Sequence, residues 1–154
     1  MLSNDILRSV RYILKANNND LVRILALGNA EATAEQIAVW LRKEEEEGFQ
    51  RCPDIILSAF LNGLIYEKRG KDESAPALER RVNNNIVLKK LRIAFSLKTD
   101  DILAILTEQK FRVSMPEITA MMRAPEHKNF RECGDQFLRY FLRGLAARQH
   151  EKKA

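Results

Sequence analysis

The chain has 154 residues and a formal net charge of +5; 45% of its residues are hydrophobic and 31% are charged. This composition is typical of a globular protein in water, and no stretch approaches the 18 apolar residues of a membrane-spanning helix. Residues 1–15 carry charges throughout their apolar run, which predicts an amphipathic helix and not a signal peptide. We therefore expect a cytoplasmic protein without a membrane partner.

The excess positive charge lies in the second half of the chain. Residues 1–70 hold 9 Lys and Arg against 10 Asp and Glu, whereas residues 83–154 hold 14 against 8. An anionic partner would therefore meet the second half first. The alternative interpretation is a solvated face followed by a basic tail.

One helical unit occurs twice. Residues 4–65 align with residues 85–146 at a constant offset of 81 without a gap, and 16 of the 62 columns are identical. Unrelated segments would match in roughly four columns. Since a lone unit of about 60 residues is marginally stable, we expect an all-α fold of two tandem four-helix repeats packed as a pseudo-twofold body. The predicted parts are repeat 1 (residues 1–69), a linker (70–82), repeat 2 (83–147) and a basic tail (148–154).

The first helix of each repeat is predicted by apolar residues at helical spacing. Between residues 6 and 14 they recur every three or four positions, with charged residues between them. Ser3 or Asn4 can cap this helix, because short polar side chains accept hydrogen bonds from its first backbone N–H groups. In the second repeat we expect the cap at Asn83 or Asn84.

The second helix is predicted over residues 20–27, where Gly28 ends it. Its counterpart is predicted over residues 100–109, behind Thr99 as the cap. Acidic residues in the first turn suit the positive end of the helix dipole. Between the repeats, residues 70–77 are polar and turn-forming, which is typical of a mobile linker.

The third helix begins at a capping box in both repeats, over residues 33–36 and 114–117. In repeat 1 it is expected to run into the four glutamates at residues 44–47. In repeat 2, Pro125 stands in this stretch, so the helix should stop earlier.

The fourth helix carries the most similar segment of the two repeats. Pro53 and Gly134 occupy one column, so a new helix is expected to begin there. A glycine inside a helix costs about 1 kcal/mol relative to alanine, so Gly63 and Gly144 predict that another helix approaches closely there. One place for such an approach is the contact between the two copies. An interaction face is therefore predicted from the apolar residues of the two fourth helices: Phe60, Gly63, Leu64, Phe141, Gly144 and Leu145.

The sequence lacks the residue clusters from which an enzyme site is built. His127 and His150 have no repeat partners and no second ligand at metal-binding spacing. Cys52 and Cys133 are repeat equivalents, which favours small core residues over reactive thiols or a disulfide. We expect no catalytic residue, no cofactor and no metal site.

Two pairs of arginines are repeated in both copies, and neither a catalytic nor a metal site explains them. Arg11 and Arg92 share one column, and Arg42 and Arg123 share a second. The repeated aspartates, at positions 20, 54, 101 and 135, fall in first turns and are explained as caps. Our hypothesis is that the arginines pair with these aspartates between helices and fix the packing.

Residues 88–123 are similar in pattern to a helix-turn-helix domain, with residues 114–123 as the would-be recognition helix. The long connection before that helix and the acidic counterpart in repeat 1 weaken this interpretation. A nucleic-acid or anion face remains as the alternative, formed by the basic residues of repeat 2: Lys89, Lys90, Arg92, Arg123, Arg139 and Arg143.

Six sequence segments carry a resemblance to a known family. They are the opening NDILRSVRYILKANN, the segments FQRCPD and FRECGD, the endings FLNGL and FLRGL, and the restart NNNIVLKKLRIAF. In these features the chain resembles the bacterial YehS-like proteins, a family of unknown function with one or two copies of a domain. The resemblance implies a small, cytosolic, all-α bacterial protein and carries over no catalytic residue.

The sequence therefore favours a non-enzymatic interaction module. Its partner would be an unidentified protein or a second copy of the chain, bound in the groove between copies or on the face of the last helices. Nucleic acid bound electrostatically on the basic face is the alternative.

Overall fold

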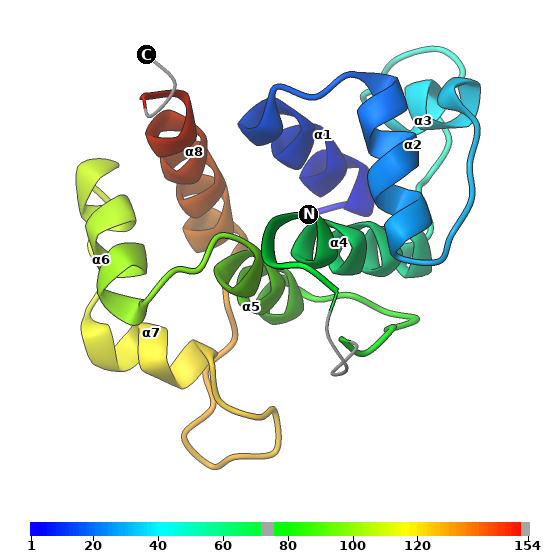
Figure 1. The fold of residues 1–154 in the computed structure, drawn as a ribbon. Coiled ribbons are helices and arrows are strands. Elements are labelled where there is room, and N and C mark those ends of the chain that lie inside the picture. Colours follow the sequence, from blue (N-terminus) through cyan, green and yellow to red (C-terminus); the bar gives the residue numbers. More distant parts are fainter. Residues whose placement is uncertain (72–75, 152–154) are drawn as a thin grey trace. The chain divides into compact units, whose positions relative to one another are not determined.

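The computed structural model describes residues 1–71 and 76–151. These residues form α-helices joined by irregular segments and contain no strand (Figure 1), which confirms the predicted all-α class. Each helix of the second half begins 81 residues after its counterpart in the first. The helices are α1 (Ser3–Leu14), α2 (Asn18–Leu27), α3 (Ala34–Trp40), α4 (Asp54–Arg69), α5 (Asn84–Ala94), α6 (Thr99–Glu108), α7 (Met115–Met121) and α8 (Asp135–Glu151).

The chain divides into two compact units, Met1–Val82 and Asn83–Ala154. Each unit holds one complete set of four helices, so the unit boundary coincides with the predicted start of repeat 2. The pseudo-twofold packing of the repeats stays a prediction. Residues 72–75 of the predicted linker and 152–154 of the predicted tail lie outside the described residues.

Short polar side chains cap the starts of α2, α3, α5 and α7. The side chains of Asn17, Thr33 and Asn83 accept hydrogen bonds from the backbone N–H three residues on, at 2.8, 3.1 and 2.9 Å. Ser114 and Glu117 form the full capping box. Short polar side chains thus satisfy backbone donors that the first helical turn leaves free.

Several sequence predictions about helix ends are wrong. Ser3 and Asn4 lie inside α1 and do not cap it; instead the Asp5 carboxylate accepts from Leu2 N at 3.0 Å. Thr99 is the first residue of α6, behind Lys98. The predicted tail from residue 148 is helical as far as Glu151, because α8 continues to that residue.

The third helices end in the same column, and α3 does not run into the glutamates at residues 44–47. We expected α7 to be the shorter of the two. Both have 7 residues, and their last residues are Trp40 and Met121. Tertiary hydrogen bonds to these two residues accompany the common end.

A buried asparagine, which we call the asparagine clamp, makes these bonds in each repeat. Asn4 Nδ2 donates to Trp40 O at 3.0 Å and to Gln50 O at 2.9 Å, and Asn4 Oδ1 accepts from Cys52 N at 2.9 Å. The same three bonds, at 3.0, 2.9 and 2.9 Å, join Asn85 to the equivalent residues of repeat 2. One side chain therefore connects the first helix, the end of the third helix and the loop before the fourth.

The clamp stabilises backbone groups that the helices leave without partners. Asn4 is 0% exposed and Asn85 is 5% exposed, so water cannot replace the amide. A buried backbone group without a hydrogen bond costs about 1–3 kcal/mol. An amide offers both donors and an acceptor, and among similarly sized side chains only asparagine matches two carbonyls and one N–H.

The second and fourth helices of repeat 1 approach each other closely at two glycines. A Cβ on Gly63 would lie 1.9 Å from Ile24 O, and a Cβ on Gly28 would lie 1.8 Å from Ala59 O. The close approach that Gly63 and Gly144 predict is confirmed, but it lies inside each repeat. In repeat 2 a Cβ on Gly144 would meet Ile105 Cγ2 at 2.6 Å.

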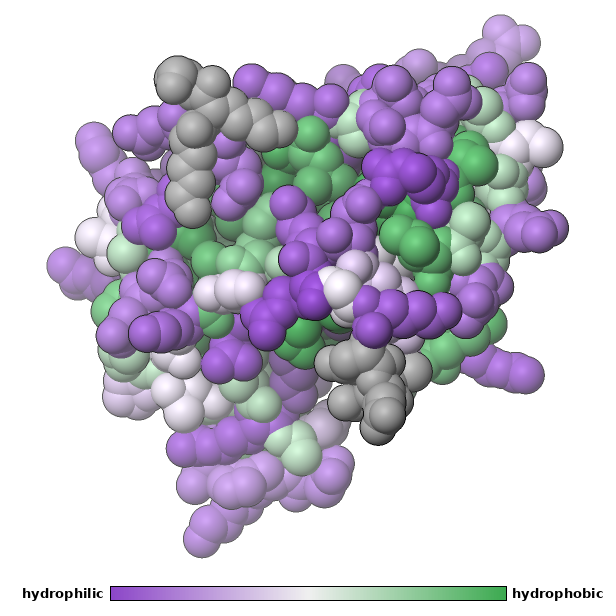
Figure 2. Space-filling view, viewed as in Figure 1, coloured by the Kyte–Doolittle hydropathy of each residue, from purple (hydrophilic) through white to green (hydrophobic). Residues whose placement is uncertain are grey.

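The surface seen in Figure 2 is mostly hydrophilic, with hydrophobic atoms in separate areas. Among the described residues, the large hydrophobic side chains that are exposed are Tyr12, Ile55, Leu78 and Ile93. Within the described residues, none of the helices combines the length and the hydropathy that crossing a membrane requires.

Replacing Asn4 with alanine should remove the clamp of repeat 1. Two carbonyls and one N–H would then be buried without partners, so the free energy of unfolding should fall by about 3 kcal/mol or more. The chain contains 1 Trp, Trp40, which lies at the clamp. Urea unfolding followed by its fluorescence measures the change, with exposed Asn19→Ala as the control. An unchanged midpoint in Asn4→Ala would contradict the role of the clamp.

Gly63→Ala should destabilise the protein more than Gly144→Ala. In Gly63→Ala the new Cβ would meet the backbone oxygen of Ile24, which cannot move without shifting α2. At position 144 the nearest atom is Ile105 Cγ2, which belongs to a side chain. Overpacking of this kind costs about 1–3 kcal/mol, and Gly63→Ala should lie at or above the upper end. Thermal unfolding by circular dichroism compares the two variants, and equal losses would argue against backbone contact as the cause.

Candidate functional site

The aspartates shared by both repeats form hydrogen bonds at the starts of helices. Asp20 accepts from Asn17 N at 2.9 Å and Asp101 accepts from Lys98 N at 2.7 Å, as caps. Asp54 accepts from Ser3 Oγ at 2.7 Å. These groups hold helix starts in place, which accounts for their repetition without chemistry.

The hypothesis that the repeated arginines pair with aspartates is wrong for two of them. Arg42 Nη1 donates to Glu47 O at 3.2 Å, and Arg123 Nη1 donates to Asn129 O at 3.0 Å. Both guanidinium groups thus close the loop that follows the third helix. Arg11 is exposed, and Arg92 Nε is buried without a hydrogen-bond partner among the described residues.

The two cysteines are free and buried, and their environments match. Burial, together with the charge of Asp54, raises the pKa of Cys52 to about 12, and burial beside Asp135 raises the pKa of Cys133 to about 12. The reactive form of a thiol is the thiolate, which these environments disfavour. In addition, the backbone N–H of each cysteine is held by the asparagine clamp.

The basic residues predicted on repeat 2 do not all serve one surface. Lys89 Nζ donates to Arg123 O at 3.1 Å, which repeats the bond from Arg8 to Arg42 O in the first unit. Lys90 is 6% exposed. The exposed members of the set are Arg139 and Arg143, which lie one turn apart on α8.

The predicted interaction face is buried, so the structure contradicts that assignment. Gly63 and Gly144 are in contact with α2 and α6 of their own repeats. The other four members, Phe60, Leu64, Phe141 and Leu145, are at most 1% exposed. Their helical spacing reflects the core of each repeat, because apolar side chains on an inner helix face follow the same pattern as a docking stripe.

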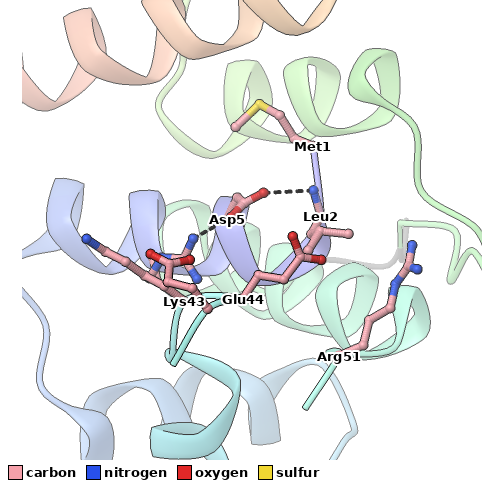
Figure 3. Close-up of a pocket in the computed structure, with 8 residues that line it drawn as sticks. Met1, Leu2, Asp5, Lys43, Glu44 and Arg51 are labelled. Atoms are coloured by element: carbon pink, nitrogen blue, oxygen red, sulfur yellow. Dashed lines mark hydrogen bonds and ion pairs between the residues drawn. The ribbon is translucent and has the colours of Figure 1, made fainter. Parts of the chain in front are cut away.

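A depression of about 590 Å³ lies beside the start of α1 (Figure 3). Asp5 bonds both to Leu2 N and to the Arg8 guanidinium at its wall. Its lining includes three acidic and three basic side chains, so their charges largely offset one another and select no ligand of one sign. Its lining residues are Met1, Leu2, Asp5, Arg8, Lys43, Glu44, Glu45 and Arg51.

The outer face of α4 holds the chain segment Ala77–Val82, which we call the docked segment. Ser58 Oγ donates to a Glu79 carboxylate oxygen at 2.6 Å and accepts from Glu79 N at 2.9 Å. Asn62 Nδ2 donates to Ala77 O at 3.1 Å, and Val82 N donates to Asp54 Oδ2 at 2.9 Å. This part of the predicted linker is therefore bound to repeat 1.

The corresponding face of α8 has different residues. The counterparts of Ser58 and Asn62 are Arg139 and Arg143. The Arg143 guanidinium lies 5.0 Å from the centre of the Tyr140 ring, within the range of a cation–π interaction. Phe111 lies 5.2 Å from Tyr140, and a third ring, Phe137, lies 5.9 Å from Phe111. Arg143 thus lies beside a cluster of aromatic rings.

The aromatic half of this cluster was missed by the sequence analysis. Phe111 and Tyr140 occupy the columns of Ala30 and Ala59 in repeat 1. A comparison of the alignment columns in which the two repeats differ, rather than those in which they are identical, would have identified Phe111 and Tyr140. Identical columns mark the shared core, whereas a pair of alanines replaced by two aromatic rings marks a surface on which the repeats have diverged.

Fold and repeated contacts define a protein made of two tandem copies of one four-helix unit. The family model described as a protein of unknown function (DUF1456) matches residues 3–70 and 84–150, and the chain belongs to this family. The uncharacterized protein YehS of Escherichia coli (strain K12) is 94% identical to the chain over 99% of both sequences, which confirms the resemblance. No solved structure matches the chain.

Both thiols should be unreactive in the native protein. With a pKa of about 12, each is almost entirely protonated at pH 8, so it should react with a disulfide reagent more than about tenfold slower than in urea. Absorbance of the released thiolate measures the rate, and the 2 Cys of the sequence should both react after unfolding. Rapid reaction of either thiol in the folded protein would contradict the burial.

Proposed function

We propose that this protein is a non-enzymatic interaction module that binds a protein partner or a second copy of itself. The observation that carries the proposal is the docked segment. An outer face of α4 binds six residues of irregular chain through three side chains. A helix face with this capacity is suited to recognising a polypeptide.

The use of the shared polar groups supports a non-enzymatic role. Asn4, Asp20 and Arg42, each of which has an identical counterpart in repeat 2, are engaged in hydrogen bonds of their own fold. The thiols are held protonated by burial. A catalytic group instead needs a free pair of electrons or a proton that it can exchange near neutral pH.

Nucleic acid is the second candidate, favoured by the arginines and aromatic rings of α8. Two observations place it second. First, α7, the would-be recognition helix, has 7 residues, and Pro116 and Thr119 are among its exposed side chains. Second, Lys89 Nζ donates to Arg123 O and the Arg123 guanidinium donates to Asn129 O, so fewer charges of the predicted basic face remain for phosphates.

Affinity capture from the native cell, with and without nuclease, tests the proposal. We expect a protein, either a partner or the untagged chain itself, to be retained in fixed proportion after nuclease treatment. Size-exclusion chromatography with light scattering then distinguishes a complex from self-association. Retention that disappears with nuclease would overturn the proposal and favour nucleic acid.

A further inference from the structure

The docked segment shows how the fourth helix of a repeat recognises extended chain. Its three contacts on α4 are Asp54, Ser58 and Asn62, which are four residues apart and therefore lie on one helix face. They span about 12 Å along the axis, at 1.5 Å per residue. Over this length the face binds one carboxylate, one carbonyl and two N–H groups of the segment.

On α8 the same three positions are Asp135, Arg139 and Arg143. Asp135 keeps the place and type of Asp54, and the amide of Asn84, 2.7 Å away, holds its pKa below the usual range. At the other two positions, neutral donors are replaced by arginine. Arginine donates to carboxylates and carbonyls, as serine and asparagine do, and adds a positive charge and a bidentate geometry.

The arginines are exposed, and the site beside them is built from rigid groups. The Tyr140 ring lies beneath the Arg143 guanidinium at 5.0 Å, and Phe111 supports that ring at 5.2 Å. Arg139 Nη1 donates to Gln136 Oε1 at 3.2 Å, one turn towards the start of α8. Aromatic support limits the conformations of a guanidinium and so reduces the entropy lost on binding.

We propose that the face of α8 formed by Arg139, Tyr140 and Arg143 binds an extended acidic segment of a partner protein. A carboxylate of that segment pairs with Arg139, as Glu79 pairs with Ser58, and a backbone carbonyl accepts from Arg143, as Ala77 O accepts from Asn62. The proposal rests on the proposed function and names the site and the chemistry of the partner.

One bond of the template has no counterpart on α8. Ser58 Oγ also accepts from Glu79 N, whereas arginine has no acceptor. In the bound segment, the backbone N–H equivalent to Glu79 N must therefore bond to water. A second carboxylate of the segment, paired with Arg139 or Arg143, compensates for this missing hydrogen bond. For this reason we infer a segment with two or three acidic residues, and not a copy of the docked segment, which carries Arg80 and Arg81.

A labelled peptide of residues 76–83 with Arg80→Glu and Arg81→Glu is the probe. Its fluorescence anisotropy is measured with the full chain and with Arg139→Ser/Arg143→Asn, which introduces the residues of repeat 1. The double variant should weaken binding at least tenfold, equal to about 1.4 kcal/mol. The matched control is Lys43→Ser/Arg51→Ser, which removes two exposed charges from the first unit and should change binding less than twofold.

The same peptide with all glutamates replaced by glutamine should bind at least tenfold more weakly to the wild-type chain. Equal affinity for the two peptides, or for the wild type and Arg139→Ser/Arg143→Asn, would overturn the inference, as would absence of binding at millimolar peptide. A single-stranded oligonucleotide that binds more tightly and is lost in the same variant would overturn it in favour of nucleic acid.

The outcome separates this inference from the proposed function. If the wild type and Arg139→Ser/Arg143→Asn capture the same protein from the cell in equal amount, the proposed interaction module stands, but α8 is not its binding site. Loss of all capture on nuclease treatment removes the interaction module itself.

Discussion

The asparagine clamp is the constraint on which the rest of each repeat depends. The first helix, the end of the third helix and the loop before the fourth come together at this point. The backbone polar groups of the helix end and the loop have no partners within a helix. One buried amide bonds to two carbonyls and one N–H, at 2.9–3.0 Å in both repeats. The position of the fourth helix follows from this junction, because Cys52 and Cys133, whose N–H groups the clamp holds, lie two residues before α4 and α8.

The fourth helix is placed in the same way twice, but the two repeats share the residues of its inner face and differ on its outer face. The inner face keeps phenylalanine, leucine and glycine in both repeats, because α2 or α6 packs on it. On the outer face, Ser58 and Asn62 of repeat 1 hold the chain's own segment, whereas repeat 2 has Arg139 and Arg143. A duplicated unit can thus use one copy of a surface for its own linker and leave the other free to diverge.

Local signals predicted local structure well. The helix starts at Thr33, Ser114 and Asn83 were found because capping depends on residues within one turn. Predictions failed where a distant contact decides the outcome. Asn4 resembles a cap in sequence, but its amide reaches residues 36, 46 and 48 positions away. Similarly, Gly63 indicated close helix packing but not which helix packs against it, since a missing Cβ is compatible with any neighbouring backbone.

The sequence by itself determined the helical class, the duplication at an offset of 81 residues and the membership of a family, because periodicity and identity are properties of the chain alone. Only the tertiary structure decided which shared residues are core and which face is free. Phe141 and Arg143 lie two positions apart on one helix, yet the first is buried and the second exposed. The physical reason is that burial and hydrogen bonding depend on what packs against a residue, and that neighbour lies tens of residues away in the chain.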